Sequence, residues 1–178
     1  MTTSDPFEMG TIFLTGFMGT GKSTVGLLLA KRIGYCFIDL DEMISEEAGA
    51  NIPEIFAKSG EEGFRDMETS MLRRLADRDG LIISTGGGAV LRDENRRIMR
   101  DAGHVINLTA SVDALSERLA DDDSRPLLQC DEPIERIITL LAQREPMYRD
   151  CDVQIDTSHK SPDEILDEIL TWLKKCKD

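Results

Sequence analysis

Residues 16–24 read Gly-Phe-Met-Gly-Thr-Gly-Lys-Ser-Thr, a glycine-rich stretch that ends in a lysine and two hydroxyl side chains. The apolar run 11–15 before it predicts a buried parallel strand, and the apolar periodicity of 25–33 after it predicts a helix. Strand, glycine-rich turn and helix N-terminus in this order are the context of a Walker A phosphate loop. The sequence therefore predicts that the chain binds a nucleoside triphosphate.

The residue types of this loop suit phosphate chemistry. Gly16 and Gly21 let the backbone wrap closely enough for its N–H groups to point at phosphate oxygens. The helix that follows adds the positive end of its dipole. Lys22 can reach the terminal phosphates, and the hydroxyl of Ser23 can ligate a magnesium ion. The alternative is a glycine turn with an incidental Lys-Ser pair, which the flanking strand and helix disfavour.

The composition is that of a soluble globular protein, with 178 residues of which 40% are hydrophobic and 31% are charged. No apolar run approaches the ~18 residues of a membrane span. Residues 1–9 lack the features of a signal peptide, and we expect them to be a loose tail. The net charge of −13 argues against nucleic-acid binding. We therefore expect a cytoplasmic monomer that acts on a small molecule without nucleic-acid or membrane partners.

The four cysteines are widely scattered and show none of the spacings of a metal site. Cys36 and Cys151 fall in strand-like runs, so we expect both side chains to be small buried apolar groups.

Strand-like runs alternate with amphipathic segments along the whole chain. Further strands are predicted at 36–39, 81–84, 105–108 and 153–155, and further helices near 41–48, 51–58, 61–77, 93–102, 112–119, 134–145 and from 162 onward. This alternation predicts a parallel sheet with helices on both faces. The fold expected for residues 1–178 is one doubly wound α/β domain, with a five-stranded parallel sheet flanked by helices.

Residues 121–133 interrupt this pattern with acidic residues, two prolines and Arg125. A stretch this irregular inside a compact domain is usually functional or mobile. Phosphoryl transfer needs water to be excluded, and a mobile lid that delivers an arginine on closure would meet that need. We therefore predict that 121–133 is a lid. A solvated acidic loop without a role is the alternative.

Asp39 and Asp41 follow the second predicted strand. Because a strand repeats every two residues, both carboxylates can face the same side, at the edge of the sheet where ligands bind. One can hold magnesium through water, and the other can accept a hydroxyl proton during phosphoryl transfer. Alternatively, Asp41 merely caps the next helix.

Other candidates are weaker when taken singly. Arg65 could form only a surface ion pair with Glu61, and Arg144 could simply complement a helix dipole. Residues 86–88 are three consecutive glycines after a strand, which indicates that another group approaches the backbone closely. A permissive loop remains the alternative for these glycines.

Taken together, these motifs resemble the shikimate kinase family, in that family's order and from about residue 11 to the final helix. The matching motifs are Gly16-Phe17-Met18-Gly19-Thr20-Gly21-Lys22-Ser23-Thr24, Asp39-Leu40-Asp41, Phe64-Arg65-x-x-Glu68, Gly86-Gly87-Gly88, Arg125-Pro126-Leu127-Leu128 and Arg144-x-Pro146-x-Tyr148-Arg149. The resemblance implies a P-loop kinase fold like that of nucleoside-monophosphate kinases. It also implies transfer of the γ-phosphoryl group of ATP to the 3-hydroxyl of shikimate, giving shikimate 3-phosphate in aromatic amino acid biosynthesis.

The resemblance also implies roles for individual residues. The catalytic residues would be Lys22, Asp41 as the base, and Arg125 from the lid. ATP would be held by Gly19, Thr20, Gly21, Lys22, Ser23, Thr24, Arg118 and Arg125, with Arg118 and the loop 157–162 beside the adenine. Shikimate would be held by Asp41, Arg65, Gly86, Gly87, Gly88 and Arg144. Mg²⁺ would be ligated by Ser23, with Asp39 acting through water.

One departure lies in the phosphate loop, where Thr20 replaces the alanine associated with the family, a change that keeps the backbone donors. The nearest rival function is another small-molecule kinase of this fold, acting on gluconate or a nucleoside monophosphate. A GTP-dependent switch would need an Asn-Lys-x-Asp motif, and the sequence has no Asn-Lys pair. A catalytically dead homologue would be expected to have lost Lys22, Asp41 or one of the two arginines expected to hold shikimate, Arg65 and Arg144. All four residues are present.

Overall fold

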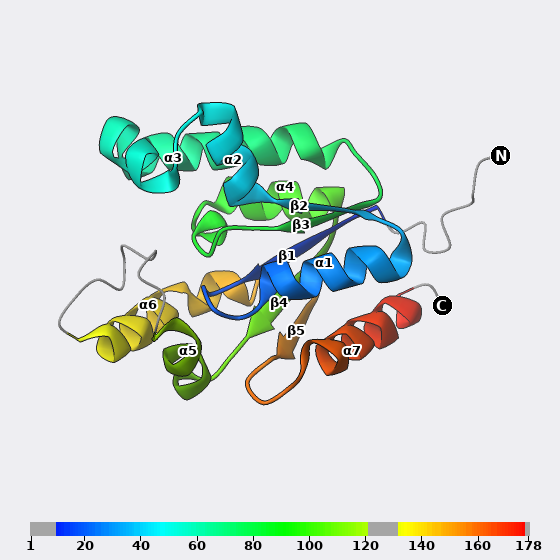
Figure 1. Ribbon diagram of the computed structural model, residues 1–178. Helices are drawn as coiled ribbons and strands as arrows, with labels where there is room; N and C mark the ends of the chain where they lie inside the picture. Colours follow the sequence, from blue (N-terminus) through cyan, green and yellow to red (C-terminus); the bar gives the residue numbers. More distant parts are fainter. Residues whose placement is uncertain (1–9, 121–131, 177–178) are drawn as a thin grey trace.

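The computed structural model describes residues 10–120 and 132–176 (Figure 1). Its centre is a five-stranded sheet in the order β2-β3-β1-β4-β5, in which every neighbouring pair is parallel. The strands are β1 (Thr11–Gly16), β2 (Cys36–Asp39), β3 (Leu81–Ser84), β4 (Gly103–Thr109) and β5 (Val153–Asp156). The predicted α/β fold is thus confirmed. The expected tail at 1–9 and residues 121–131 of the expected lid lie outside the described residues.

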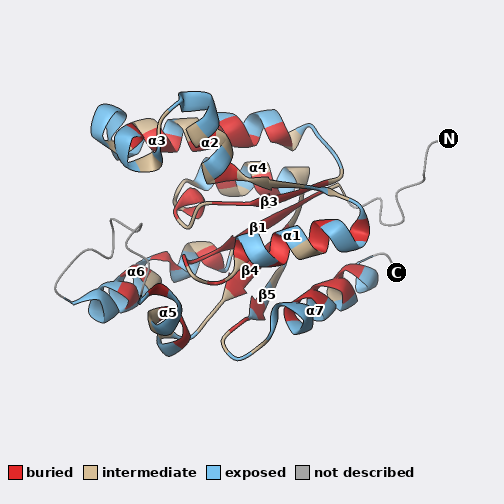
Figure 2. Ribbon diagram, viewed as in Figure 1, coloured by how far each residue is buried: buried red, intermediate tan, exposed pale blue. Residues whose placement is uncertain are grey.

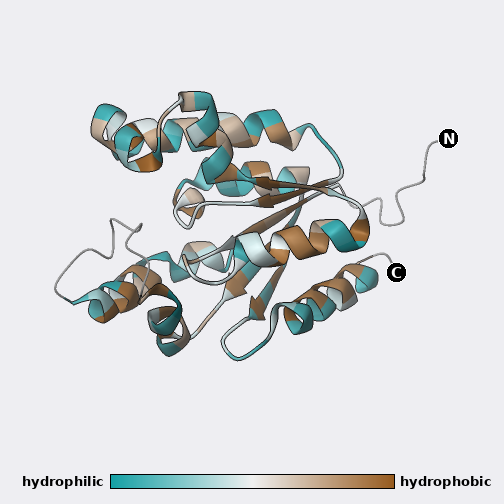
Figure 3. Ribbon diagram, in the orientation of Figure 1, coloured by the Kyte–Doolittle hydropathy of each residue, from teal (hydrophilic) through white to brown (hydrophobic). Residues whose placement is uncertain are grey.

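Helices cover both faces of the sheet. Helices α1 (Lys22–Ile33) and α7 (Pro162–Lys175) pack on one face, where Leu14, Ile106 and Ile155 point. The other face carries α2 (Leu40–Ala48), α3 (Ile52–Ala76), the short 3₁₀ helix η1 (Ala89–Leu91), α4 (Asp93–Ala102), α5 (Val112–Leu119) and α6 (Pro133–Tyr148). Figures 2 and 3 show that the central strands β1, β3 and β4 are largely buried and apolar and that the outer sides of the helices are exposed and polar, while the edge strands β2 and β5 are only partly buried. This is the burial expected of a parallel sheet with two covered faces.

Local sequence chemistry explains several boundaries. Asn51 caps α3 in a capping box with Glu54, and Ser161 does the same for α7. Two helices were predicted where α3 lies, and α3 does contain a break at Gly60, which has a φ of 71°. The predicted helix boundaries at 58 and 61 therefore fall on either side of a glycine in a non-helical conformation.

Two expectations were wrong. The helix predicted to end near Glu145 continues through Pro146 to Tyr148. Proline removes one helical hydrogen bond there, and the turn is anchored because the buried Tyr148 side chain bonds to a neighbouring loop. Cys36 is exposed and Cys151 only half-buried. Cys36 begins β2, which lies at the edge of the sheet, so its side chain remains accessible.

Strand register brings the functional segments together. Ser84 lies opposite Leu14 of β1 and opposite Asp39 of β2. The loops that follow these three strands are the phosphate loop, the Asp39–Asp41 segment and the turn at 86–88, so all three begin at the same edge of the sheet. Ligands bind at this edge in open parallel sheets.

Candidate active site

The phosphate loop joins β1 to α1. Gly16, Gly19 and Gly21 have φ angles of 137°, 80° and 91°, which L-residues with a side chain rarely adopt. Lys22 follows the loop and is buried, with 8% of the residue exposed. Its Nζ donates to the carbonyl oxygens of Gly16 and Phe17, each at 2.9 Å. The ammonium group is thus held inside the loop by two carbonyl groups.

The N-terminus of α1 is suited to an anion. Helices α2, α3, α5 and α7 have a side-chain cap, and α4 and α6 have acidic residues in their first turn. Among the α-helices of the described ranges, α1 alone has neither, since Gly21 stands at its N-cap and its first turn holds no acidic residue. The unpaired N–H groups and positive dipole end of this helix therefore face a phosphate without competition from a carboxylate.

Asp39 links the end of β2 to the phosphate loop. Its Oδ2 accepts a hydrogen bond from Ser23 Oγ at 2.7 Å, and its Oδ1 accepts from the backbone N–H groups of Asp41 and Glu42 at 3.1 and 3.3 Å. Asp39, and not Asp41, is therefore the cap of α2. The alternative in which Asp41 is only a helix cap is wrong, and Asp41 lies in the first helical turn.

The three consecutive glycines at 86–88 lie where charged side chains from α2 and α3 converge. A Cβ on Gly86 would lie 2.7 Å from Asp41 Oδ1 and 3.0 Å from Glu68 Oε1, and one on Gly88 would lie 2.2 Å from Arg65 Nη2. Side chains at either position would displace these charged groups. The close approach expected for 86–88 is thus present, and a merely permissive loop does not account for it.

Arg65 is buried, contrary to its reading as a surface residue. It is 7% exposed and pairs with Glu68, which is fully buried, and more weakly with Glu61 at 3.3 Å. Among the described residues, Arg65 Nε and Glu68 Oε1 have no hydrogen-bonding partner. A buried donor without an acceptor is costly, so Arg65 is poised to bind an anionic or polar ligand.

Arg144 is the second buried arginine, 6% exposed, and its guanidinium lies 5.9 Å from the centre of the Phe17 ring. The neighbouring Tyr148 hydroxyl donates to the Gly87 carbonyl at 2.6 Å. Burial raises the pKa of Tyr148, while the positive charges of Arg144 and Arg65 both act to lower it. Both guanidinium groups are therefore close to Tyr148 and to the glycine turn.

Arg118 connects the phosphate loop to the loop that follows β5. It donates to the Gly19 carbonyl at 3.1 Å and to the side chain and carbonyl of Thr157 at 3.1 and 2.5 Å. The two segments expected to border the adenine, Arg118 and the loop 157–162, are thus brought together beside Gly19. Thr24 is exposed in the first turn of α1. Arg125 lies outside the described residues.

Glu68 and Tyr148 belong to quoted motifs but were given no role from the sequence. Each is one helical turn from a candidate arginine, Glu68 three residues after Arg65 and Tyr148 four after Arg144. That spacing puts each pair on one face of its helix, and it is the signal that would have identified both.

The titration of Glu68 should be visible in protein stability. Burial raises the pKa of Glu68 to about 7, the charge of Arg65 acts against this, and the charge of Asp41 adds to it. A carboxyl with a raised pKa contributes stability at low pH that is lost as pH rises from about 4.5 to about 7. We expect the free energy of unfolding, relative to Glu68→Gln, to fall by about 3 kcal/mol over this window.

Urea unfolding of both proteins between pH 4.5 and 8 measures this difference. Glutamine is the matched control because it keeps an oxygen for Arg65 and does not titrate. Parallel stability profiles would show that Glu68 titrates normally.

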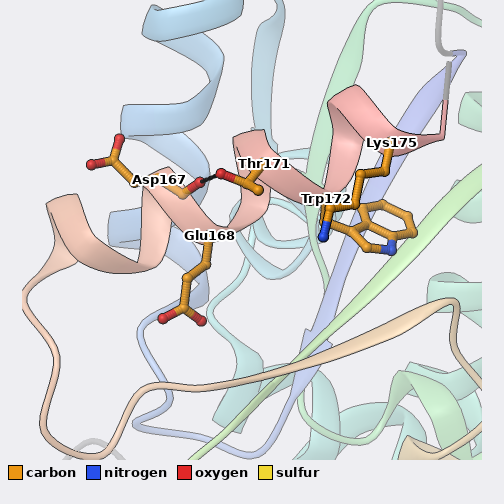
Figure 4. Close-up of a pocket in the computed structure, with 5 residues that line it drawn as sticks. All are labelled: Asp167, Glu168, Thr171, Trp172 and Lys175. Atoms are coloured by element: carbon orange, nitrogen blue, oxygen red, sulfur yellow. Dashed lines mark hydrogen bonds between the residues drawn. The ribbon is translucent and has the colours of Figure 1, made fainter. Parts of the chain in front are cut away.

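A shallow hollow elsewhere contains none of the predicted site residues. It is lined by Asp167, Glu168, Thr171, Trp172 and Lys175, all from α7 (Figure 4). Thr171 Oγ1 donates to the Asp167 carbonyl of its own helix, and the Trp172 ring packs edge-on against His104 at 5.4 Å. The Thr171 hydroxyl and the Trp172 ring are thus engaged within the fold, and we assign the hollow no role.

Sequence comparison identifies close relatives. A family model described as shikimate kinase matches residues 18–174. A shikimate kinase from Geobacter sulfurreducens is 47% identical over 172 residues, covering 97% of this chain and 95% of the relative. A shikimate kinase from Pseudomonas aeruginosa (strain LESB58) is 46% identical over 168 residues, covering 94% of this chain and 98% of the relative.

Structural comparison agrees. The shikimate kinase from Acinetobacter baumannii, solved in complex with shikimate, superimposes with a TM-score of 0.91 at 38% identity and covers 96% of both chains. A gluconokinase from Sinorhizobium meliloti 1021 reaches a TM-score of only 0.61 at 22% identity, covering 94% of this chain and 93% of its own, which is a likeness of fold alone. Matched by the family model over most of its length and nearly half identical to its relatives, this chain belongs to the shikimate kinase family.

Proposed function

We propose that this protein transfers the γ-phosphoryl group of ATP to the 3-hydroxyl of shikimate, yielding shikimate 3-phosphate and ADP for aromatic amino acid biosynthesis. The proposal rests on the groups that surround the glycine turn at 86–88. Gly86 faces Asp41, Gly88 faces Arg65, and a Cβ on Gly87 would lie 3.6 Å from the Gly16 carbonyl of the phosphate loop. A phosphate-binding loop, a carboxylate and a buried arginine thus meet around one turn.

The nucleotide is assigned to the phosphate loop and the N-terminus of α1. The backbone of Gly19, Thr20 and Gly21, together with Lys22, Ser23 and Thr24, would cradle its phosphates. The Ser23 hydroxyl and the Asp39 carboxylate are hard oxygen donors 2.7 Å apart. They fit Mg²⁺, which usually takes one or two protein oxygens and completes its shell with phosphates and water. When bound, Mg²⁺ would neutralise charge on the phosphates.

The acceptor hydroxyl is assigned to Asp41. Asp39, and not Asp41, caps α2. The Asp41 carboxylate, which lies against Gly86 of the glycine turn, would orient the hydroxyl and take its proton as the new bond forms. Asp41 and Glu68 both lie against Gly86, and the charge of Asp41 helps to raise the pKa of Glu68.

The carboxylate of shikimate is assigned to Arg65 and Arg144. Guanidinium forks bind carboxylates through paired hydrogen bonds, and the buried Arg65 Nε lacks an acceptor among the described residues. The Gly87 backbone N–H would add a donor to the same ligand. Gly86 and Gly88 would keep the neighbouring side chains in place.

Arg118 and the loop 157–162 are assigned to the adenine, beside the phosphate loop. Arg125 is assigned to the transferring phosphoryl group, on the resemblance alone, as part of a lid at 121–133. We further propose that the protein is a single-domain cytoplasmic monomer that engages neither nucleic acid nor membranes. In the part of the chain that the structure describes, no helix combines the length and apolar character needed to cross a bilayer.

An acceptor panel tests this function. Purified protein with MgATP is given shikimate, gluconate or a nucleoside monophosphate, and ADP release is coupled to a spectrophotometric readout. We expect ADP release to match shikimate consumed, with ³¹P NMR showing a phosphate monoester on the product. Faster turnover with gluconate or a nucleotide, both substrates of rival kinases of this fold, would overturn the assignment.

The two arginines of the carboxylate clamp should be essential for binding the acceptor. Arg144→Ala and Arg65→Ala should each weaken shikimate binding by roughly 2–4 kcal/mol, the scale of a buried charge-assisted pair. Arg→Lys should also fail, because an ammonium group cannot reproduce the paired geometry. ATP affinity should change far less.

Titration calorimetry with each ligand measures both effects. Arg73→Ala is the control, because Arg73 is an exposed arginine on the same helix as Arg65. In the described part of the chain it forms an ion pair with Glu94, which is also exposed. Equal losses of shikimate and ATP affinity would count against the clamp.

A further inference from the structure

The carbonyl oxygen of Phe17 is shared by three donors of the phosphate loop. It accepts a hydrogen bond from Thr20 Oγ1 at 2.8 Å, from Lys22 Nζ at 2.9 Å and from the Thr20 backbone N–H at 3.3 Å. The two shortest of these bonds come from side chains. The same oxygen that holds the ammonium group of Lys22 is therefore itself held by the Thr20 hydroxyl.

The Thr20 side chain is enclosed within the loop. Thr20 is 1% exposed, and its Oγ1 lies 3.1 Å from where a Cβ on Gly16 would stand. Thr20 also lines a cavity of about 270 Å³ together with Phe17, Asn107 and Tyr148. The hydroxyl therefore faces the backbone of the loop, and almost none of Thr20 is exposed at the protein surface.

We propose that Thr20 is a positioning residue for Lys22, acting through the Phe17 carbonyl. A carbonyl oxygen accepts well along its two lone-pair directions, so a buried hydroxyl on one side fixes where the second donor can sit. Without the hydroxyl, only the longer amide contact restrains the Phe17 peptide from that side. The Lys22 ammonium would then lose a fixed position relative to the phosphates that it binds.

This inference rests on the proposed function in one respect, that Lys22 binds the nucleotide phosphates. It goes beyond that function because the ligand contacts assigned to Thr20 are those of its backbone. If the proposal is right, removing the Thr20 hydroxyl weakens nucleotide binding only when Lys22 is present. A purely structural hydroxyl would instead change nucleotide binding to the same extent whether or not Lys22 is present.

The variant that isolates the hydroxyl is Thr20→Val. Valine keeps the branched shape, whereas alanine would also enlarge the adjoining cavity. The Phe17 carbonyl would keep Lys22 and the Thr20 amide as donors, so no acceptor is left unsatisfied and the fold should persist. Thr20→Ser keeps the hydroxyl and is the matched control.

A double-mutant cycle on MgADP affinity tests the proposal, using titration calorimetry on the full chain. Thr20→Val should weaken binding about three- to tenfold in the wild-type background, the scale of one hydrogen bond, and less than twofold in a Lys22→Met background. Thr20→Ser should bind normally, and thermal unfolding should confirm that each variant is folded. An equal effect in both backgrounds would overturn the proposal, as would an unchanged affinity of Thr20→Val.

These outcomes are distinct from a failure of the proposed function. A protein that shows the predicted cycle with MgADP but phosphorylates a different acceptor would overturn the assignment of shikimate and support the role of Thr20. Wild-type protein that does not bind MgADP would contradict both.

Discussion

Replacing Lys22 with methionine is expected to lower the rate of phosphoryl transfer by about a thousandfold or more. Transfer of a phosphoryl group depends mainly on positioning and on electrostatic stabilisation, and Lys22 supplies the fixed positive charge of the phosphate loop. Methionine retains the apolar stem of the side chain without the ammonium group. The loss should appear in kcat as well as in nucleotide affinity.

Steady-state kinetics with saturating shikimate measure this loss, and circular dichroism verifies that the variant is folded. Lys31→Met is the matched control, because Lys31 is an exposed lysine in the last turn of the same helix. Near-normal turnover of Lys22→Met would remove the basis for the nucleotide assignment.

Features governed by neighbouring residues could be predicted from the sequence. The phosphate loop and the strands at 36–39 and 81–84 depend on periodicity and side-chain chemistry within a few positions. Such features need no knowledge of the tertiary fold. The α/β class followed from them because alternating strands and helices have few ways to pack.

The environment of Arg65 could not be predicted in this way. Its spacing from Glu61 favoured a surface ion pair, and that pair exists at 3.3 Å. What buries Arg65 is the turn at Gly88, which is 23 positions away in the sequence and leaves room for the guanidinium only because it has no side chain. Contacts of this kind are set by the packing of α3 against a loop of the sheet, which residue spacing does not encode.

The same limit applied to α6. The helix was expected to end near Glu145, and a proline such as Pro146 normally disrupts a helix because it removes a hydrogen bond and clashes with the preceding turn. The bond between Tyr148 and Gly87, which joins positions 61 residues apart, anchors one further turn. Arg144 is thereby presented next to Phe17 of the phosphate loop. Family resemblance had named Arg144 as a ligand, but the reason for its position lies in this long-range contact.

Replacing Asp41 with asparagine is expected to lower kcat by about 10²–10⁴-fold, the usual contribution of a general base. Asparagine can still orient a hydroxyl but cannot accept its proton. The Michaelis constant for ATP should change little, because Asp41 faces the glycine turn and Glu68 and the nucleotide is assigned to the phosphate loop. Rapid-quench measurements of a single turnover would separate this chemical step from product release.

Glu42→Gln is the control for Asp41→Asn, because it removes an exposed carboxylate from the same turn of α2 while leaving the cap by Asp39 intact. A second readout does not involve turnover. The charge of Asp41 contributes to the raised pKa of Glu68, so Asp41→Asn should move the titration of Glu68 to lower pH, as followed by carboxyl ¹³C NMR. A shifted Glu68 titration with kcat unchanged would show that Asp41 lies where the structure places it but is not the base.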